Sequence, residues 1–436
     1  MQILDQFPRL SAYDPGAQGE GGLDPLGLGA VADRIADVMV PGIRARMSQP
    51  RFTTVSAIGA IAYQGLHDLT ADGGKTTVDI AFEWLVVEAM ARYPGNGRIE
   101  GLPGNQKAAQ AKIKNERLSR GNYLNGPRVF GFTGVYRPFS RDAGVLTPDD
   151  RPDEHAARLV RAWEHDVDFP GYVDGLHGTR GAQLRRDIAE ACQRSLEKGE
   201  CSAPQNGQLL RSLSELLAPR EAKAKERGVL RELIATGRHE VRNELAALLI
   251  SNLPAEGISQ RDLAQQLLQR APSLGASTAR ALRAGFDYEE AATAIDNVFR
   301  RFLAFTTQQH GSAIDPTTAL RTPGLAELAA SIGDRVKRAI DAVADLGDNG
   351  LTQDVAYGLE RFVDIFTADA LLDALILRHE EVQANKKKLS WLDRIGKDWT
   401  VRIPYRNQNG DLSDAIWTHP MRLVTLAHFL RETRQA

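Results

Sequence analysis

The stretch VDIAFEWLVVEAMARY, residues 78–93, decides the fold class of this chain. It is nearly continuous in apolar character, with Glu83 and Glu88 as interruptions, and it ends at the turn residues PGNG. An apolar run of this length exceeds an ordinary strand and is typical of a helix that is buried on most sides. The stretch therefore predicts a helix in the core of a helical protein.

Helical patterns extend in both directions from this stretch. Upstream, GLGAVADRIADVMVPGIRARM (residues 27–47) has apolar residues at helical spacing until Pro41 ends the pattern. Downstream, residues 150–310 are almost wholly helical by pattern, and amphipathic helices are expected at 325–346 and 353–383. We therefore predict a mainly α, multi-domain protein.

Two small β elements are also expected. Near 127–146, the segment PRVFGFTGVYRPFSRDAGVL alternates glycines with aromatic and β-branched residues, which favours short strands or a compact turn. Near 399–417, a C-terminal hairpin is predicted to turn at Asn409-Gly410.

Length and composition set the organisation of the chain. A chain of 436 residues is too long for one core. The breaks in the pattern suggest an N-terminal helical domain at 1–148, a helical middle domain at 149–310 and a C-terminal helical domain at 311–436. Cys192 and Cys201 are the only cysteines, which is typical of reduced thiols in the cytoplasm. No secretion signal and no run of eighteen apolar residues is present, so we expect no membrane partner.

Charge is distributed unevenly along the chain. The formal net charge is only -2, yet residues 107–128 and 386–406 are each net +5. Gathering like charges costs self-repulsion, which a polyanion or an acidic partner can offset. The cations of the first island are predicted to contact nucleic acid or a partner; they are Lys107, Lys112, Lys114, Arg117, Arg120 and Arg128.

The second island interleaves cations with aromatic residues. Its predicted contact residues are Lys386, Lys387, Lys388, Trp391, Arg394, Lys397, Trp399, Arg402, Tyr405 and Arg406. Aromatic rings can stack on bases while cations neutralise phosphates, as on single-strand binding surfaces. The alternative is that Trp391 and Trp399 pack against the helix around 371–376 and only the lysines face water.

Signals for catalysis are weak. The loop at 95–104 lacks the spacing of a phosphate-binding loop, and no nucleophile elbow is present. His155, His165, Asp166 and Asp168 could form a metal-dependent nuclease or phosphohydrolase site, but the two histidines are ten residues apart and would not share one helix face. A helix pair at 259–286, in which Ser259 is predicted to cap the first helix and Arg280 and Arg283 lie on the second, has the outline of a helix-turn-helix. We predict no catalytic residues, no metal and no cofactor.

Two blocks of the sequence resemble a known group of proteins. Residues 22–61 share a DxLGL stretch, a helix that ends in a Pro-Gly pair and an arginine-rich step; the matching residues are Asp24, Leu26, Gly27, Leu28, Pro41, Gly42, Arg44, Arg46, Arg51 and Phe52. Residues 379–406 share an HxxVQxxKGKxxW step followed by a basic strand, with Lys387 where the pattern has glycine. Both blocks resemble bacterial proteins encoded in antiviral defence islands. The resemblance implies a role beside helicases, nucleases or methyltransferases in defence against foreign DNA.

The charge pattern and the resemblance together predict a non-catalytic, cytoplasmic subunit of a multi-protein antiphage system. It would bind DNA or hold a nuclease, helicase or other defence subunit. Two alternatives stay open at this point, the metal-dependent enzyme described above and a structural adaptor whose basic islands bind acidic protein surfaces.

Overall fold

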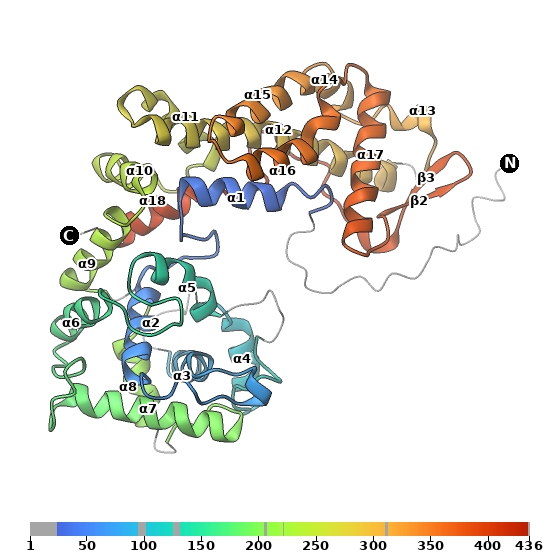
Figure 1. Ribbon diagram of the computed structural model, residues 1–436. Helices are drawn as coiled ribbons and strands as arrows, with labels where there is room; N and C mark the ends of the chain where they lie inside the picture. Colours follow the sequence, from blue (N-terminus) through green and yellow to red (C-terminus); the bar gives the residue numbers. More distant parts are fainter. Residues whose placement is uncertain are drawn as a thin grey trace. The chain divides into compact units, whose positions relative to one another are not determined.

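The computed structural model describes residues 24–94, 102–124, 131–204, 207–220, 222–309 and 313–434 (Figure 1). The protein is mainly α with small β elements, which confirms the predicted fold class. Its described residues form two compact units, unit 1 (24–39 and 257–421) and unit 2 (40–256 and 422–434). The unit boundaries thus differ from the three consecutive segments suggested by the sequence. They differ because α1 (Gly29–Met39) packs on α12 (Ala276–Gln309) and α16 (Asn349–Leu359), while α18 (Leu423–Glu432) packs on α9 (Ala224–Ala235) and α10 (Glu240–Ser251).

Unit 2 consists of helices and connecting loops. Its α-helices are α2 (Arg51–Ala62), α3 (Val78–Arg92), α4 (Asn105–Ile113), α5 (Phe132–Asp142), α6 (Ala156–Val167), α7 (Arg180–Lys198), α8 (Gln208–Leu216), α9 (Ala224–Ala235), α10 (Glu240–Ser251) and α18 (Leu423–Glu432). The predicted buried helix is α3, in which all residues except Ile80 and Arg92 are buried. Helix α2 is buried along its whole length, and a Cβ at Gly59 would lie 2.5 Å from the ring of Phe82, so glycine is needed there.

The β element predicted near 127–146 was wrong for its described part. Residues 132–142 form helix α5, and its buried residues Phe132, Val135, Tyr136 and Phe139 follow the spacing of a helix. The glycines and β-branched residues suggested strands, but the aromatic residues occupy one helical face. Phe132 stacks on Phe52, Tyr136 lies tilted against the same ring, and Phe139 packs on Phe429. Residues 125–130 of the predicted element lie outside the described residues.

Unit 1 is built on a long central helix. Its α-helices are α1 (Gly29–Met39), α11 (Gln260–Gln269), α12 (Ala276–Gln309), α13 (Pro316–Ala319), α14 (Leu325–Ala329), α15 (Ile332–Ala344), α16 (Asn349–Leu359) and α17 (Ala368–Asn385). Ser259 caps α11 as its position predicted, accepting a hydrogen bond from the N–H of Asp262 at 3.0 Å. The next helix, α12, runs for 34 residues and packs extensively on α15. The pair α11–α12 is thus part of a helical core, although Arg280 and Arg283 are exposed.

A three-stranded antiparallel sheet completes unit 1. Its strands are β1 (Ala313–Ile314), β2 (Leu392–Ile395) and β3 (Asp398–Val401), in the order β1-β3-β2. The hairpin of β2 and β3 turns at Gly396 and Lys397, so the prediction of a hairpin at 399–417 placed it too late in the chain.

The segment after the hairpin has no strand and is held by side chains of α12. Arg301 donates to the carbonyl of Leu412 at 2.6 Å, and Thr293 accepts from the N–H of Thr418 at 3.0 Å. These bonds satisfy backbone groups that form no hydrogen bond to a neighbouring strand.

None of the helices in the described ranges is both long enough and apolar enough to cross a membrane.

Candidate functional site

The start of the first sequence block that carries the resemblance meets the second block in unit 1. Residues 24–28 lie against α17, where Arg378 donates to the carbonyl of Leu26 at 2.9 Å and Lys386 donates to the carbonyl of Asp24 at 2.6 Å. The Nδ1 atom of His379 lies 3.0 Å from the carbonyl oxygen of Pro25. The residues that make these contacts are more than 350 positions apart in sequence, yet side chains of residues 378–386 bond to backbone carbonyls of residues 24–26. Much of this motif therefore has a structural role.

His379 also joins this site to the hairpin. Its Nε2 accepts a hydrogen bond from the N–H of Trp391 at 2.9 Å, so Nδ1 carries the proton that is donated to Pro25. Burial lowers the pKa of His379 to about 4, although the Pro25 carbonyl acts in the opposite direction. His379 is thus a neutral, buried residue whose two ring nitrogens link residues 24–28 to the start of the hairpin.

Lys387 occupies a backbone conformation that favours glycine. It follows the end of α17 with φ of +56°, and its N–H donates to the carbonyl of Ala384 at 2.9 Å. This is the position at which the resembling pattern has glycine. The left-handed conformation costs a residue with a Cβ about 1 kcal/mol more than it costs glycine.

Lys387→Gly should therefore raise the free energy of unfolding by about 1 kcal/mol. The measurement is the urea midpoint followed by circular dichroism. Lys387→Ala is the matched control, because it removes the same side chain but keeps a Cβ at this φ. Equal stability of the two variants would refute the backbone explanation.

Part of the second island belongs to the core. The side chain of Trp391 is only 2% exposed, and its ring stacks on Tyr405 with centroids 4.5 Å apart. Arg402 is buried and forms an ion pair with Asp393 at 2.7 Å. All three side chains are buried. The prediction that they contact nucleic acid or a partner was therefore wrong, and they pack inside the protein. Trp391 is thus internal, as the alternative predicted, but its ring–ring contacts are with Phe299, His379 and Tyr405, none of which lies within residues 371–376.

The exposed remainder of this island lies on the hairpin and in the turn that follows α17. Arg394 lies over the ring of Trp399, 5.0 Å from its centroid, and the two residues face each other across the strands. Trp399 is half-buried, whereas Arg394, Lys397 and Lys387 are exposed. No ion pair joins these three cations to any part of the chain that the structure describes. We name Lys387, Arg394, Lys397 and Trp399 the basic hairpin.

The other cations of the second island have local partners. The ammonium group of Lys386 binds Asp24, and Lys388 also has a contact within the protein. Arg406 donates to the carbonyl of Val401 at 2.9 Å.

The first island lies in unit 2 and is partly neutralised there. Arg117 pairs at 2.9 Å with Glu88, a buried carboxylate that also accepts the N–H of Leu118. Partial burial alone would lower the pKa of Arg117, but its bond to Glu88 and the charge of that carboxylate raise it. Lys112 donates to the carbonyl of Ala91 at 2.8 Å. These two cations therefore stabilise the fold.

The remaining cations of the first island lie on helix α4 and on the residues that follow it. Lys107 and Lys114 are exposed, Arg120 is half-buried, and Ile113 is 84% exposed. Arg128 lies outside the described residues. The first island belongs to unit 2 and the second to unit 1.

The residues of the metal-site alternative do not converge. His155 precedes α6 and His165 lies near its end, so about 15 Å of helix separates them. Asp166 accepts the N–H of Glu226 at 2.8 Å, and Asp168 is exposed after the helix. In the ranges that the structure covers, no group of three or more His, Cys, Asp or Glu side chains could hold a metal ion.

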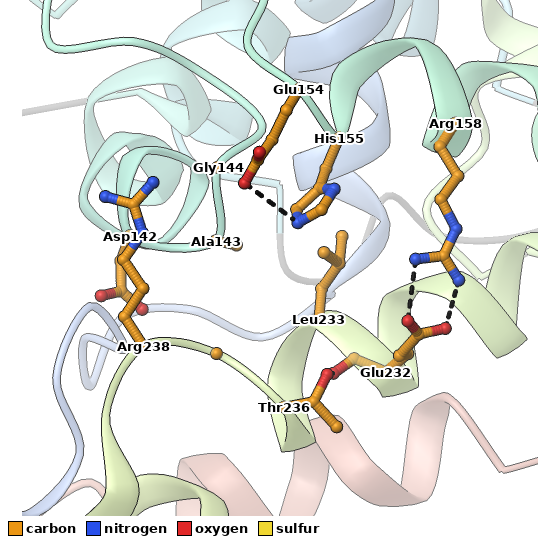
Figure 2. A pocket seen from close by; sticks show the side chains of 11 residues that line it. Asp142, Ala143, Gly144, Glu154, His155, Arg158, Glu232, Leu233, Thr236 and Arg238 are labelled. Carbon is orange, nitrogen blue, oxygen red and sulfur yellow. Dashed lines mark hydrogen bonds and ion pairs between the residues drawn. The ribbon is translucent and has the colours of Figure 1, made fainter.

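Sequence reasoning missed a pocket of about 230 Å³ in unit 2 (Figure 2). It lies between α6 and the end of α9. Its charged and titratable residues are Asp142, Glu154, His155, Arg158, Glu232 and Arg238. The segments that contribute them are separated by about 75 residues, and neither carries a recognisable motif. Only the packing of α6 on α9 brings them together.

No protein-family model, curated protein or solved structure matches this chain.

Both cysteines are buried and free. Burial raises the pKa of Cys192 and of Cys201 well above the ordinary value of a thiol, which keeps both unreactive.

Proposed function

We propose that this protein is a non-catalytic, cytoplasmic subunit of a bacterial antiviral defence system that binds DNA through the basic hairpin. The observation that supports DNA binding most directly is Arg394 lying over the half-buried ring of Trp399, beside exposed Lys397. A guanidinium plane can stack on an unpaired base, and neighbouring cations can neutralise the phosphates on either side. The resemblance to defence-island proteins supports the biological setting.

A protein partner is the second candidate, and helix α4 favours it. Ile113 is almost fully exposed between Lys112 and Lys114. A phosphate backbone needs cations but gains nothing from an exposed isoleucine, whereas a protein surface can bury that side chain. We propose that α4 binds an acidic surface of a nuclease or helicase subunit, with Lys107 and Lys114 at the edge.

The test of DNA binding is fluorescence anisotropy with single-stranded and duplex DNA. Three exposed cations should give a log-log salt slope of roughly -2 on single-stranded DNA and -3 on duplex DNA. The variant Arg394→Glu with Lys397→Glu should weaken binding to single-stranded DNA at least about tenfold.

Helix α4 offers the matched control. The pair Lys107→Glu with Lys114→Glu changes the net charge equally, but in the other unit, and should leave DNA affinity nearly unchanged. Equal losses in both double variants would show that overall charge, and not the hairpin, governs binding. Absence of DNA binding at low salt would overturn the proposal and leave the protein partner as the remaining candidate.

A further inference from the structure

The pocket of unit 2 has walls of different chemical character (Figure 2). The ring of His155 and the side chain of Leu233 point into it from opposite sides, and Arg158 and Arg238 flank it. Leu233 is buried and apolar, while the two arginines carry fixed positive charge. The site can therefore hold an organic group between His155 and Leu233 and an anionic group beside the arginines.

Each acidic side chain of the pocket already has a partner. Asp142 binds Arg242 and also His239, the latter at 2.5 Å. Glu232 binds the guanidinium of Arg158 through both of its oxygens. Glu154 lies on the exposed rim, 3.4 Å from the ring of His155. Asp142 and Glu232 are therefore engaged by the protein's own arginines, and Glu154 lies against the imidazole of His155.

The arginines keep donors available for a ligand. Arg158 has five N–H donors, of which Glu232 uses two. Arg238 is exposed and has no ion pair in the described ranges. An incoming anion can bind Arg238 without displacing a carboxylate.

Buried positive charge lies beneath the pocket. The side chain of Arg242 is fully buried, and its Nε and Nη2 have no hydrogen-bond partner within the described ranges. A Cβ at Gly237, which lines the pocket, would lie 1.9 Å from that Nη2. The adjoining pocket shares Glu232 and adds Arg231 and Arg434. Because Asp142 already pairs with Arg242, the cations that favour an anion at this face of α9 are Arg231, Arg238 and Arg434.

We propose that the pocket binds a small organic molecule that carries a phosphate group. A tetrahedral phosphate presents oxygens on several sides and can meet two arginines that flank the site, whereas a carboxylate presents its oxygens at one edge. The volume of about 230 Å³ is below that of pockets for drug-sized ligands, which suits a sugar phosphate or a mononucleotide. Arg238 anchors the phosphate, Arg158 is its second contact, and the organic part lies between His155 and Leu233.

The test is isothermal titration of the whole chain with inorganic phosphate, ribose 5-phosphate and AMP, beside ribose and adenosine. The phosphorylated probes should bind with Kd below about 1 mM, and the phosphate-free probes should not. Arg238→Gln should weaken binding at least about tenfold, because one charge-assisted contact is lost. Arg186→Gln is the matched control, since Arg186 is also exposed in unit 2 but does not line the pocket.

Two results would overturn the proposal. One is that no phosphorylated probe binds at about 5 mM; the other is that Arg238→Gln and Arg186→Gln bind equally well. The substituted side chains are exposed, so circular dichroism should show both variants folded. The double variant Arg394→Glu with Lys397→Glu should bind these probes normally, so that failure of the pocket and failure of the hairpin are distinguishable.

Discussion

Replacing Arg51 with methionine should lower the free energy of unfolding by about 3–5 kcal/mol, because it leaves the buried carboxylate of Glu226 unpaired. The side chain of Arg51 is 3% exposed and that of Glu226 is fully buried, with Nε and Oε1 3.2 Å apart. Arg51 also donates to the carbonyl of Leu216 at 3.0 Å. Burial raises the pKa of Glu226, and the charge of Arg51 acts in the opposite direction. The ionised form of Glu226 is therefore stabilised by the guanidinium of Arg51.

The measurement is urea unfolding followed by circular dichroism. Arg158→Met is the control, since it breaks an equally direct ion pair that is exposed and should cost less than about 1 kcal/mol. Adding Glu226→Gln to Arg51→Met should recover part of the loss, because the unpaired charge disappears. A loss below about 1 kcal/mol in Arg51→Met would contradict the prediction.

The stability of unit 1 should fall at alkaline pH through His419. Its Nδ1 lies 2.8 Å from Oε1 of Glu289 in the buried interior. Burial alone would lower the pKa of His419, but the carboxylates of Glu289, Asp296 and Asp24 outweigh it and raise the pKa to about 9. The folded-state pKa therefore lies above the unfolded value of about 6.5. The contribution to stability is complete below about pH 6.5 and is lost as the pH rises through about 9, with a total of about 3 kcal/mol.

His419→Gln should remove most of this alkaline loss while lowering stability at neutral pH. Urea unfolding at about pH 7.5 and about pH 9.5 measures the difference. This pH window avoids the titration of Glu83 in unit 2. Burial raises the pKa of Glu83 to about 7, so its contribution to stability is lost mainly as the pH rises toward about 7, below the window. The window also avoids His379, whose contribution is present above about pH 6.5 and is lost as the pH falls toward about 4. An unchanged alkaline loss in the variant would exclude His419 as its source.

The two basic islands illustrate what can and cannot be predicted from the charges in a sequence. The sequence located both islands, but it did not separate exposed cations from those that balance buried groups. Arg117 and Arg402 belong to the second kind. Arg117 pairs with the buried carboxylate of Glu88, 29 residues away, and the buried guanidinium of Arg402 pairs with Asp393 of strand β2. The arginines of the pocket were missed because they are not clustered along the chain.

The sequence by itself determined the mainly helical class, the buried helix α3 and the cap of α11, because each depends on spacing within one segment. Tertiary structure alone decided that residues 24–28 pack on α17, that 132–142 are helical and that Trp391 is internal. It also decided which arginines line the pocket. The physical reason is that burial and ion pairing depend on which remote segments meet, and local periodicity carries no information about partners hundreds of residues away.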